Sequence, residues 1–260
     1  MNEENALELA KEAVKAVAEK AYDDLAHPAL QTAGEILSLP LKVIDAKLIP
    51  IKEWVAQEQY NYQRTLRLLG EKMANVEEEK ITSPENYVAI PALQQIAYCY
   101  DSEELRNMYS NLLAASMNAD TKWNVHPAYV DIIKQLTPDE AKLLRVLQTR
   151  KLFPVIHVKQ YMIDKKSYHD IAQNVSTLET HCDCPRRIYS YLNNLNRLGL
   201  INIDYSTYCT YDGAYDELDS RFADLKAEWE SKGGELRILH GLIELTAFGR
   251  DFSKTCIDMN

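Results

Sequence analysis

The sequence has 260 residues, 46% of them hydrophobic and 26% charged, a composition that excludes collagen-like, low-complexity and disordered proteins. Its 39 acidic residues outnumber its 29 basic ones, so the formal net charge is −10 and a wholesale basic nucleic-acid binder is excluded. Only eight glycines leave little material for the turns of β-sandwiches or for glycine-rich phosphate loops. A mostly α protein is therefore expected.

The five cysteines are scattered and odd in number, which is typical of reduced thiols and argues against a disulfide framework. Residues 1–8 are acidic where a secretory signal would be basic. The longest uncharged segment, residues 86–100, is shorter than the roughly 20 apolar residues of a spanning helix. We therefore expect a cytoplasmic protein without a membrane span.

Residues 1–75 have the pattern of amphipathic helices hinged at prolines. In the first helix, small apolar residues recur at alternating spacings of three and four, and the pattern stops before Pro28. The stripe is suited to close helix packing. We predict an N-terminal helical bundle or arm and a homo-oligomer held by Leu7, Ala10, Val14, Val17 and Ala21.

The stretch of residues 36–51 combines an apolar run with Lys42 and Lys47, and Lys52 follows it. This composition is compatible with contact with an anionic lipid surface. Packing between helices explains it equally well, so peripheral membrane contact remains an open alternative.

Residues 76–150 predict a helical middle domain, which begins with a charged linker at 76–90. Pro91 suits the first position of a helix, and Asp101 with Glu104 forms a capping-box pattern for the next one. Residues 137–140, Thr-Pro-Asp-Glu, are the strongest helix start in the chain.

Residues 151–260 predict a winged-helix-like α+β domain. The patterns indicate strands at 152–163, 200–205 and 235–245 and a short helix at 166–175. They also indicate a helix at 185–198 that ends at Gly199, and a closing helix around Phe248 to Cys256. An insertion in the wing, residues 216–232, is itself expected to be helical.

The helix at 185–198 would be the recognition helix, and its outward side chains are suited to DNA bases and phosphates. The candidate nucleic-acid-binding residues are Arg186, Arg187, Asn193, Asn194 and Arg197. Against DNA binding, residues 212–230 contain seven acids and two bases, which would repel phosphate. We favour a surface that packs or binds protein, with this acidic insertion covering the helix or recruiting a basic partner.

Motifs for metal binding and catalysis are weak. His181, Cys182 and Cys184 are metal-ligand types, but a structural zinc site needs a second pair, which does not follow at suitable spacing. No Gly-x-Ser-x-Gly, phosphate-loop, His-Glu-x-x-His or dinucleotide motif occurs. We therefore predict no metal, no cofactor, no catalytic residues and a protein that is not an enzyme.

Several segments resemble the bacterial Abi-alpha family, which is named for abortive infection. The resemblance covers residues 85–257 and is carried by Leu105–Met117, Val125–Tyr129, Ile132–Ala141, Leu198–Ile201 and Thr246–Phe252; Asp24–Pro28 also resembles the family's N-terminal part. The family has no established catalytic set, so the resemblance assigns no catalytic role.

The resemblance implies defence against phage, in which infected cells arrest or die before the phage multiplies. We expect a non-enzymatic effector or sensor that acts through a phage or host protein, with membrane contact left open. The alternative is a winged-helix DNA-binding transcriptional regulator.

Overall fold

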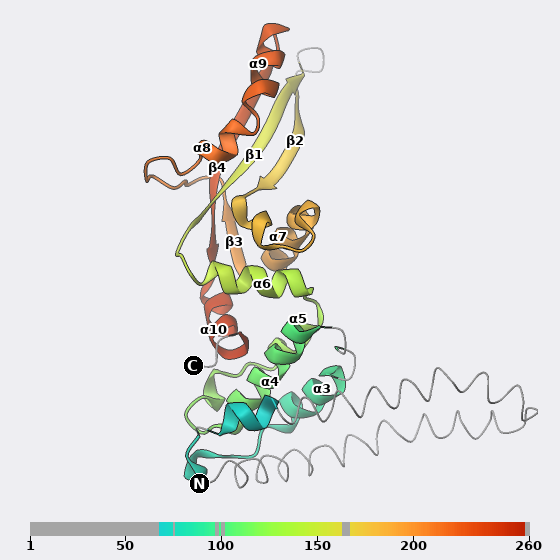
Figure 1. The fold of residues 1–260 in the computed structure, drawn as a ribbon, viewed down its shortest axis with the longest axis vertical. Coiled ribbons are helices and arrows are strands. Elements are labelled where there is room, and N and C mark those ends of the chain that lie inside the picture. Colours follow the sequence, from blue (N-terminus) through green and yellow to red (C-terminus); the bar gives the residue numbers. More distant parts are fainter. Residues whose placement is uncertain (1–67, 75, 97–98, 100–101, 163–166, 258–260) are drawn as a thin grey trace, which may run out of the picture. The chain divides into compact units, whose positions relative to one another are not determined.

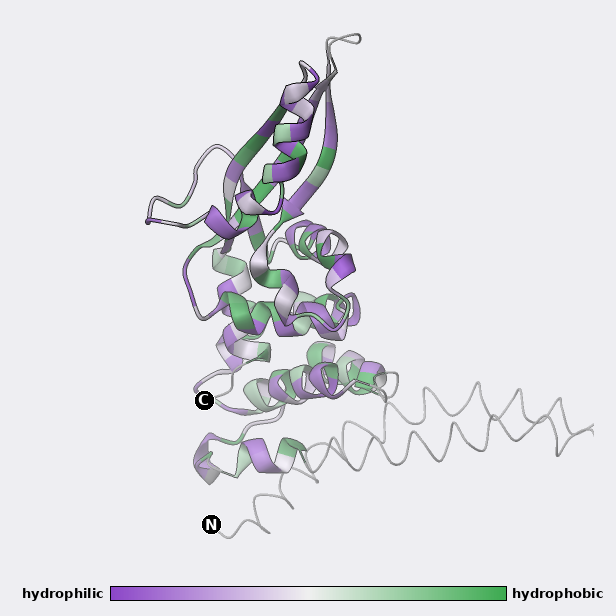
Figure 2. Cartoon of the chain, turned by 45° about the horizontal axis from the view of Figure 1, so that its top comes forward, coloured by the Kyte–Doolittle hydropathy of each residue, from purple (hydrophilic) through white to green (hydrophobic). Residues whose placement is uncertain are grey.

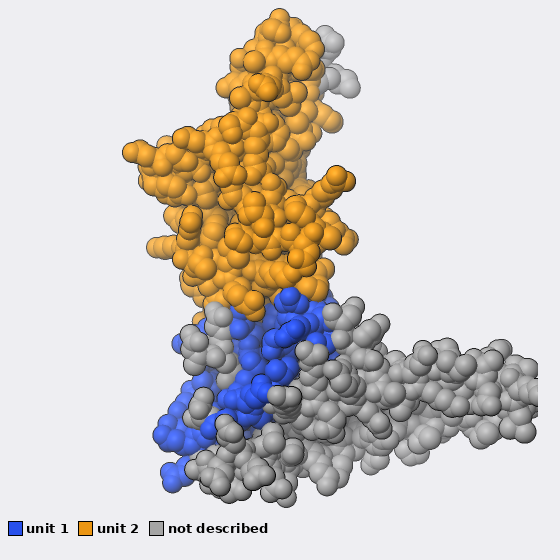
Figure 3. Space-filling view, in the orientation of Figure 1, with its two compact units in different colours: residues 1–136, 254–260 blue, residues 137–253 orange. Residues whose placement is uncertain are grey.

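The computed structural model describes residues 68–74, 76–96, 99, 102–162 and 167–257 (Figure 1). The chain divides into two compact units, residues 1–136 with 254–260 and residues 137–253, which Figure 3 colours separately. The predicted oligomerisation stripe and the stretch 36–51 lie outside the described residues, so both stay predictions. The domain boundaries expected from the sequence also stay predictions.

The described part of the first unit is helical around a buried central helix. Residues 68–73 are helical, and the elements that follow are η1 (Glu78–Lys80), α3 (Asn86–Ile96), α4 (Glu103–Met117), η2 (Lys122–Asn124) and α5 (Ala128–Lys134). Helices α3 and α5 pack on α4, which buries Tyr109, Leu112 and Leu113. Pro91 lies inside α3 rather than at its start.

Hydrogen bonds fix the start of α4 and connect its middle to the end of α10 (Ala247–Cys256). The N-cap is Ser102, whose hydroxyl accepts from the Leu105 amide, one residue after the predicted Asp101. Within the same unit, the Asn111 side-chain amide donates to the carbonyls of Cys256 and Ile257 at 2.8 and 3.1 Å. Asn111 therefore satisfies backbone carbonyls that the end of a helix leaves open.

The second unit is organised by an antiparallel sheet of four strands in the order β2-β1-β4-β3. Its elements are α6 (Pro138–Leu147), β1 (Phe153–Met162), β2 (Ser167–Val175), η4 (Thr177–His181), η5 (Pro185–Arg187), α7 (Ile188–Arg197), β3 (Ile201–Asp204), α8 (Asp216–Ser220), α9 (Ala223–Ser231), β4 (Glu235–Leu245) and α10 (Ala247–Cys256), whose last residues belong to the first unit.

The predicted fold class, a mostly α protein, is wrong, because the described residues include a four-stranded antiparallel sheet. The four strands contain 10, 9, 4 and 11 residues, and the segment 166–175 that predicted a short helix forms β2. Pairing with the long neighbouring strand β1 outweighs the weak helical preference of so short a segment. The winged-helix prediction, which placed a helix there, is not confirmed.

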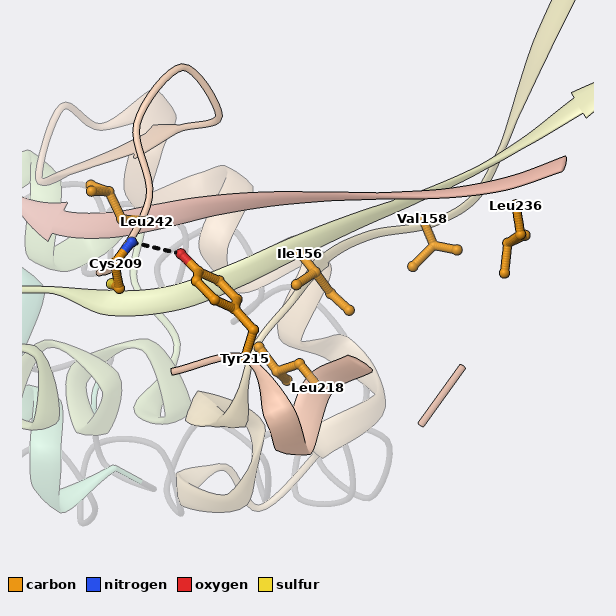
Figure 4. Close-up of a cluster of buried hydrophobic side chains, with 7 residues drawn as sticks. All are labelled: Ile156, Val158, Cys209, Tyr215, Leu218, Leu236 and Leu242. Atoms are coloured by element: carbon orange, nitrogen blue, oxygen red, sulfur yellow. Dashed lines mark hydrogen bonds between the residues drawn. The ribbon is translucent and has the colours of Figure 1, made fainter. Parts of the chain in front are cut away.

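The sheet has two different faces, because successive side chains of a strand point to opposite sides. Figure 2 shows hydrophobic and hydrophilic segments alternating along the long strands. Ile156 and Val158 belong to a core cluster with Tyr215, Leu218 and Leu236 (Figure 4). Residues of α8, α9 and the loop before them pack on this cluster, so they cover this face, here called the insertion face.

The opposite side, here called the helix face, carries His157 and Lys159 and is partly covered by α7. Helix α7 packs on β2 and β3. The phenol of Tyr205 donates to Asn174, whose side-chain amide donates to Asn193 of α7. The acidic insertion and α7 thus lie on opposite faces of the sheet, and the expected covering of α7 by this insertion is not what the structure shows.

Candidate functional site

The candidate site is the surface around α7, and it is positioned first by the start of α6. The helix start predicted at residues 137–140 is confirmed and forms a capping box: the Thr137 hydroxyl accepts from the Glu140 amide, and the Glu140 carboxylate accepts from the Thr137 amide at 2.6 Å. The other Glu140 oxygen accepts from the Asn194 side-chain amide at 2.8 Å. Because Glu140 is buried, this capping residue also attaches α7 to α6.

Three of the five residues predicted to contact nucleic acid make hydrogen bonds inside the protein. The Asn194 carbonyl oxygen accepts from Arg197 Nε at 3.2 Å and Nη2 at 2.7 Å, while Asn193 accepts from Asn174 at 3.3 Å. An asparagine reads a base with both ends of its amide. Asn194 has both ends engaged by protein groups, so it positions α7 and Arg197 rather than presenting a free amide.

Arg186 and Arg187 lie before and at the start of α7, and both are exposed. Neither guanidinium makes an ion pair or a side-chain hydrogen bond with another of the described residues. Of the predicted set, these two residues therefore present charge that the described fold does not use.

The loop before α7 is held by Asp139, a role that the sequence analysis missed. Its two carboxylate oxygens accept from the backbone amides of Asp183 and Cys184, both at 2.9 Å. Burial raises the pKa of the Asp139 carboxyl, but these amides and the Tyr191 hydroxyl outweigh burial and bring the pKa below its usual value. An aspartate in the first turn of a helix is common, so no local signal points to this contact.

The cysteines of the same loop differ in environment. Cys182 is buried, its thiol lies 3.9 Å from the Leu178 carbonyl, and burial raises its pKa to about 11, whereas Cys184 is exposed. Across the described ranges, no three His, Cys, Asp or Glu side chains are grouped as metal ligands.

A chain of polar contacts runs from the sheet to α7. His157 Nε2 lies 2.7 Å from Asp170, which also accepts from Gln173 at 2.6 Å, and the Tyr189 hydroxyl of α7 donates to Gln173 at 3.0 Å. The hydrogen bond with His157 is the main cause that lowers the pKa of Asp170. This set depends on β2 being a strand, so the sequence analysis, which expected a helix there, missed it.

This surface presents two guanidinium groups, which form no ion pair with another described residue, directly before α7. It also presents the half-exposed ring of Tyr189 on α7, a helix held by directional hydrogen bonds. Arginine and tyrosine are the side chains most enriched where proteins bind partners.

Comparison with known proteins identifies the family to which the chain belongs. The model of the family described as "Abortive infection alpha" matches residues 57–256, which is most of the chain. The chain belongs to this family. The match includes the whole of the second unit and all the residues of the surface around α7.

No curated protein matches the chain. Among solved structures, the chain is similar to one titled as an uncharacterized protein from the hydrocarbon-degrading marine bacterium Alcanivorax borkumensis SK2. The two share 19% identity over 49% of this chain and 90% of that chain, with a TM-score of 0.30. A similarity of this size carries no argument about fold or function.

Membrane contact and oligomerisation were predicted for residues 1–75, nearly all of which lie outside the described residues. In the part of the chain that the structure describes, helices are too short or too polar to span a bilayer. The stripe of Leu7, Val14 and Ala21 and the stretch 36–51 accordingly stay predictions.

Proposed function

We propose that this protein acts in antiviral defence by abortive infection, as a non-enzymatic effector or sensor that binds a phage or host protein. The observation that carries the proposal is the family match over residues 57–256, since the family is named for abortive infection. The surface around α7 supports a binding role, because two exposed arginines lie directly before a helix that internal hydrogen bonds hold in place.

A phage challenge tests the proposal. Cells carrying the gene and cells without it are infected at low and at high multiplicity, and surviving cells and released phage are counted. Abortive infection predicts that the population survives at low multiplicity with little phage release and collapses at high multiplicity. Equal phage release from both kinds of cell would refute the proposal.

Two matched variants connect the α7 surface to the function. Arg186→Ala with Arg187→Ala removes two exposed charges beside α7, and Arg150→Ala with Lys151→Ala removes two exposed charges between α6 and β1. We expect the first pair to weaken protection and the second to leave it intact. Equal protection by both variants would mean that this surface is not the one used.

The alternative function, a DNA-binding transcriptional regulator, has less support because Asn193 and Asn194 are engaged inside the protein. Overexpression separates the two classes. An effector is expected to harm the cell when it is triggered, whereas a regulator is expected to change transcript levels without loss of viability.

A further inference from the structure

A second surface lies on the loop between β3 and α8, residues 205–215, whose base is firmly anchored. The Tyr215 hydroxyl accepts from the Cys209 amide at 2.9 Å, as Figure 4 shows, and donates to the Gly241 carbonyl at 2.7 Å. The Tyr215 ring stacks on His240 with centroids 4.0 Å apart. These contacts attach the middle of the loop, at Cys209, and its C-terminal end, at Tyr215, to the insertion face.

The first turn of the loop is also ordered. The Asp204 carboxylate accepts from the Ser206 amide, the Ser206 hydroxyl and the Thr207 hydroxyl, each at 2.7 Å. Farther on, Gly213 has a φ of +72°, a backbone conformation that side chains other than glycine rarely adopt. The loop therefore has a defined conformation before any partner binds.

This ordered loop exposes two aromatic rings. Tyr208 is 62% exposed and Tyr211 is 54% exposed, on either side of the buried Cys209. Neither hydroxyl makes a hydrogen bond with another described residue. Preorganised tyrosines are typical anchors of binding surfaces, because they bury a large area with little loss of conformational entropy.

The charges around these rings indicate which partner fits. Residues 198–220 contain five acids and no Lys, Arg or His. Three of the acids have partners within the fold: Asp204 in the turn, Glu217 with Arg221 and Asp219 with His240. Asp212 and Asp216 are exposed and form no ion pair with another described residue.

From this combination we infer that Tyr208 and Tyr211, with Asp212 and Asp216, form a docking surface for a polypeptide segment rich in lysine or arginine. A tyrosine ring attracts a cation above its face and packs against the alkyl stem of lysine or arginine. The neighbouring carboxylates of Asp212 and Asp216 neutralise the positive charge of the bound lysine or arginine. The inference rests on the proposed function, for which it names the class of protein partner.

Fluorescence anisotropy with the full-length protein tests the docking surface. The probes are a short labelled peptide of alternating lysine and glycine and a glutamate-glycine peptide of the same length. We expect the basic peptide alone to bind, and we expect Tyr208→Ala with Tyr211→Ala to weaken its binding by about tenfold or more. Tyr208→Phe with Tyr211→Phe keeps the rings and should retain most of the affinity.

Two further variants act as controls. Tyr87→Ala removes a tyrosine that is 61% exposed in the other unit and should bind the basic peptide like the unchanged protein. Asp212→Asn with Asp216→Asn should weaken binding and reduce its dependence on salt. Circular dichroism confirms that each variant is folded.

Equal binding of both peptides, or unchanged affinity in the double alanine variant, would overturn the inference. Its failure is distinguishable from failure of the proposed function. Unprotected cells in the phage challenge would refute the function and leave peptide binding as measured, whereas protection without peptide binding would refute only the docking surface.

Discussion

The two faces of the sheet attach their helices by different means. On the insertion face, α8 and its preceding loop are held by an apolar cluster that includes Ile156, Tyr215 and Leu218, with hydrogen bonds of the Tyr215 hydroxyl inside this cluster. On the helix face, α7 also buries Leu192 and Leu195, but its contacts with β2 and α6 include directional hydrogen bonds from Asn194 and Tyr189.

The difference matters because apolar contacts stabilise the fold in proportion to the buried area and tolerate small shifts of the packed side chains. Hydrogen bonds, in contrast, fix the orientation of the groups that they join. We therefore expect substitutions on the insertion face to cost more stability and substitutions on the helix face to change how α7 is oriented.

The largest effect is expected for Tyr215→Ala. It removes a buried aromatic ring and two hydrogen bonds, and a loss of about 3–5 kcal/mol in the free energy of unfolding is typical of such deletions. Urea unfolding measures it. Tyr215→Phe keeps the ring and should lose only about 1–2 kcal/mol, so equal losses in both variants would mean that the hydrogen bonds dominate.

A smaller loss, about 2–3 kcal/mol, is expected for Glu140→Ala, because it removes the acceptor of the Thr137 amide and of Asn194. Hydrogen exchange should show α7 opening more readily than β4. Glu140→Gln retains one acceptor oxygen and should be less affected. Unchanged exchange in α7 would contradict the attachment through Asn194.

Asp139 is expected to make the stability of the fold sensitive to acid. Its folded pKa lies below the ordinary value of 3.8, so its contribution to stability is present above that value and is lost as pH falls through the lower folded pKa. Stability should therefore decline more steeply below about pH 4 in the unchanged protein than in Asp139→Asn. Parallel pH profiles of urea midpoints would contradict the role of this carboxylate.

The smallest effect on stability is expected for Arg186→Ala with Arg187→Ala, within about 0.5 kcal/mol, because both side chains are exposed. One of these two substitutions also tests the alternative function. If α7 contacts DNA bases, Arg187→Ala alone should weaken DNA binding by about 1–3 kcal/mol, measured by anisotropy at a fixed salt concentration. Binding of DNA that ignores this substitution would exclude α7 as the contact.

By itself, the sequence determined the features whose causes are local. The capping box of Thr137 and Glu140 is made between residues three apart, and Gly199, with a φ of +72°, ends α7 where the pattern predicts. The alternation of apolar and polar residues at 201–204 predicts β3. The family resemblance depends on short runs of residues, which can be recognised in the sequence without knowledge of the fold.

Tertiary structure alone decided which distant residues meet. The segment 167–175 becomes a strand because β1 offers its backbone donors and acceptors, and that pairing brings Asp170 to His157. Glu140 meets Asn194 across 54 positions of sequence, and Tyr215 meets His240 across the insertion face. No periodicity encodes such contacts, because they depend on strand register and on which face of the sheet each helix covers.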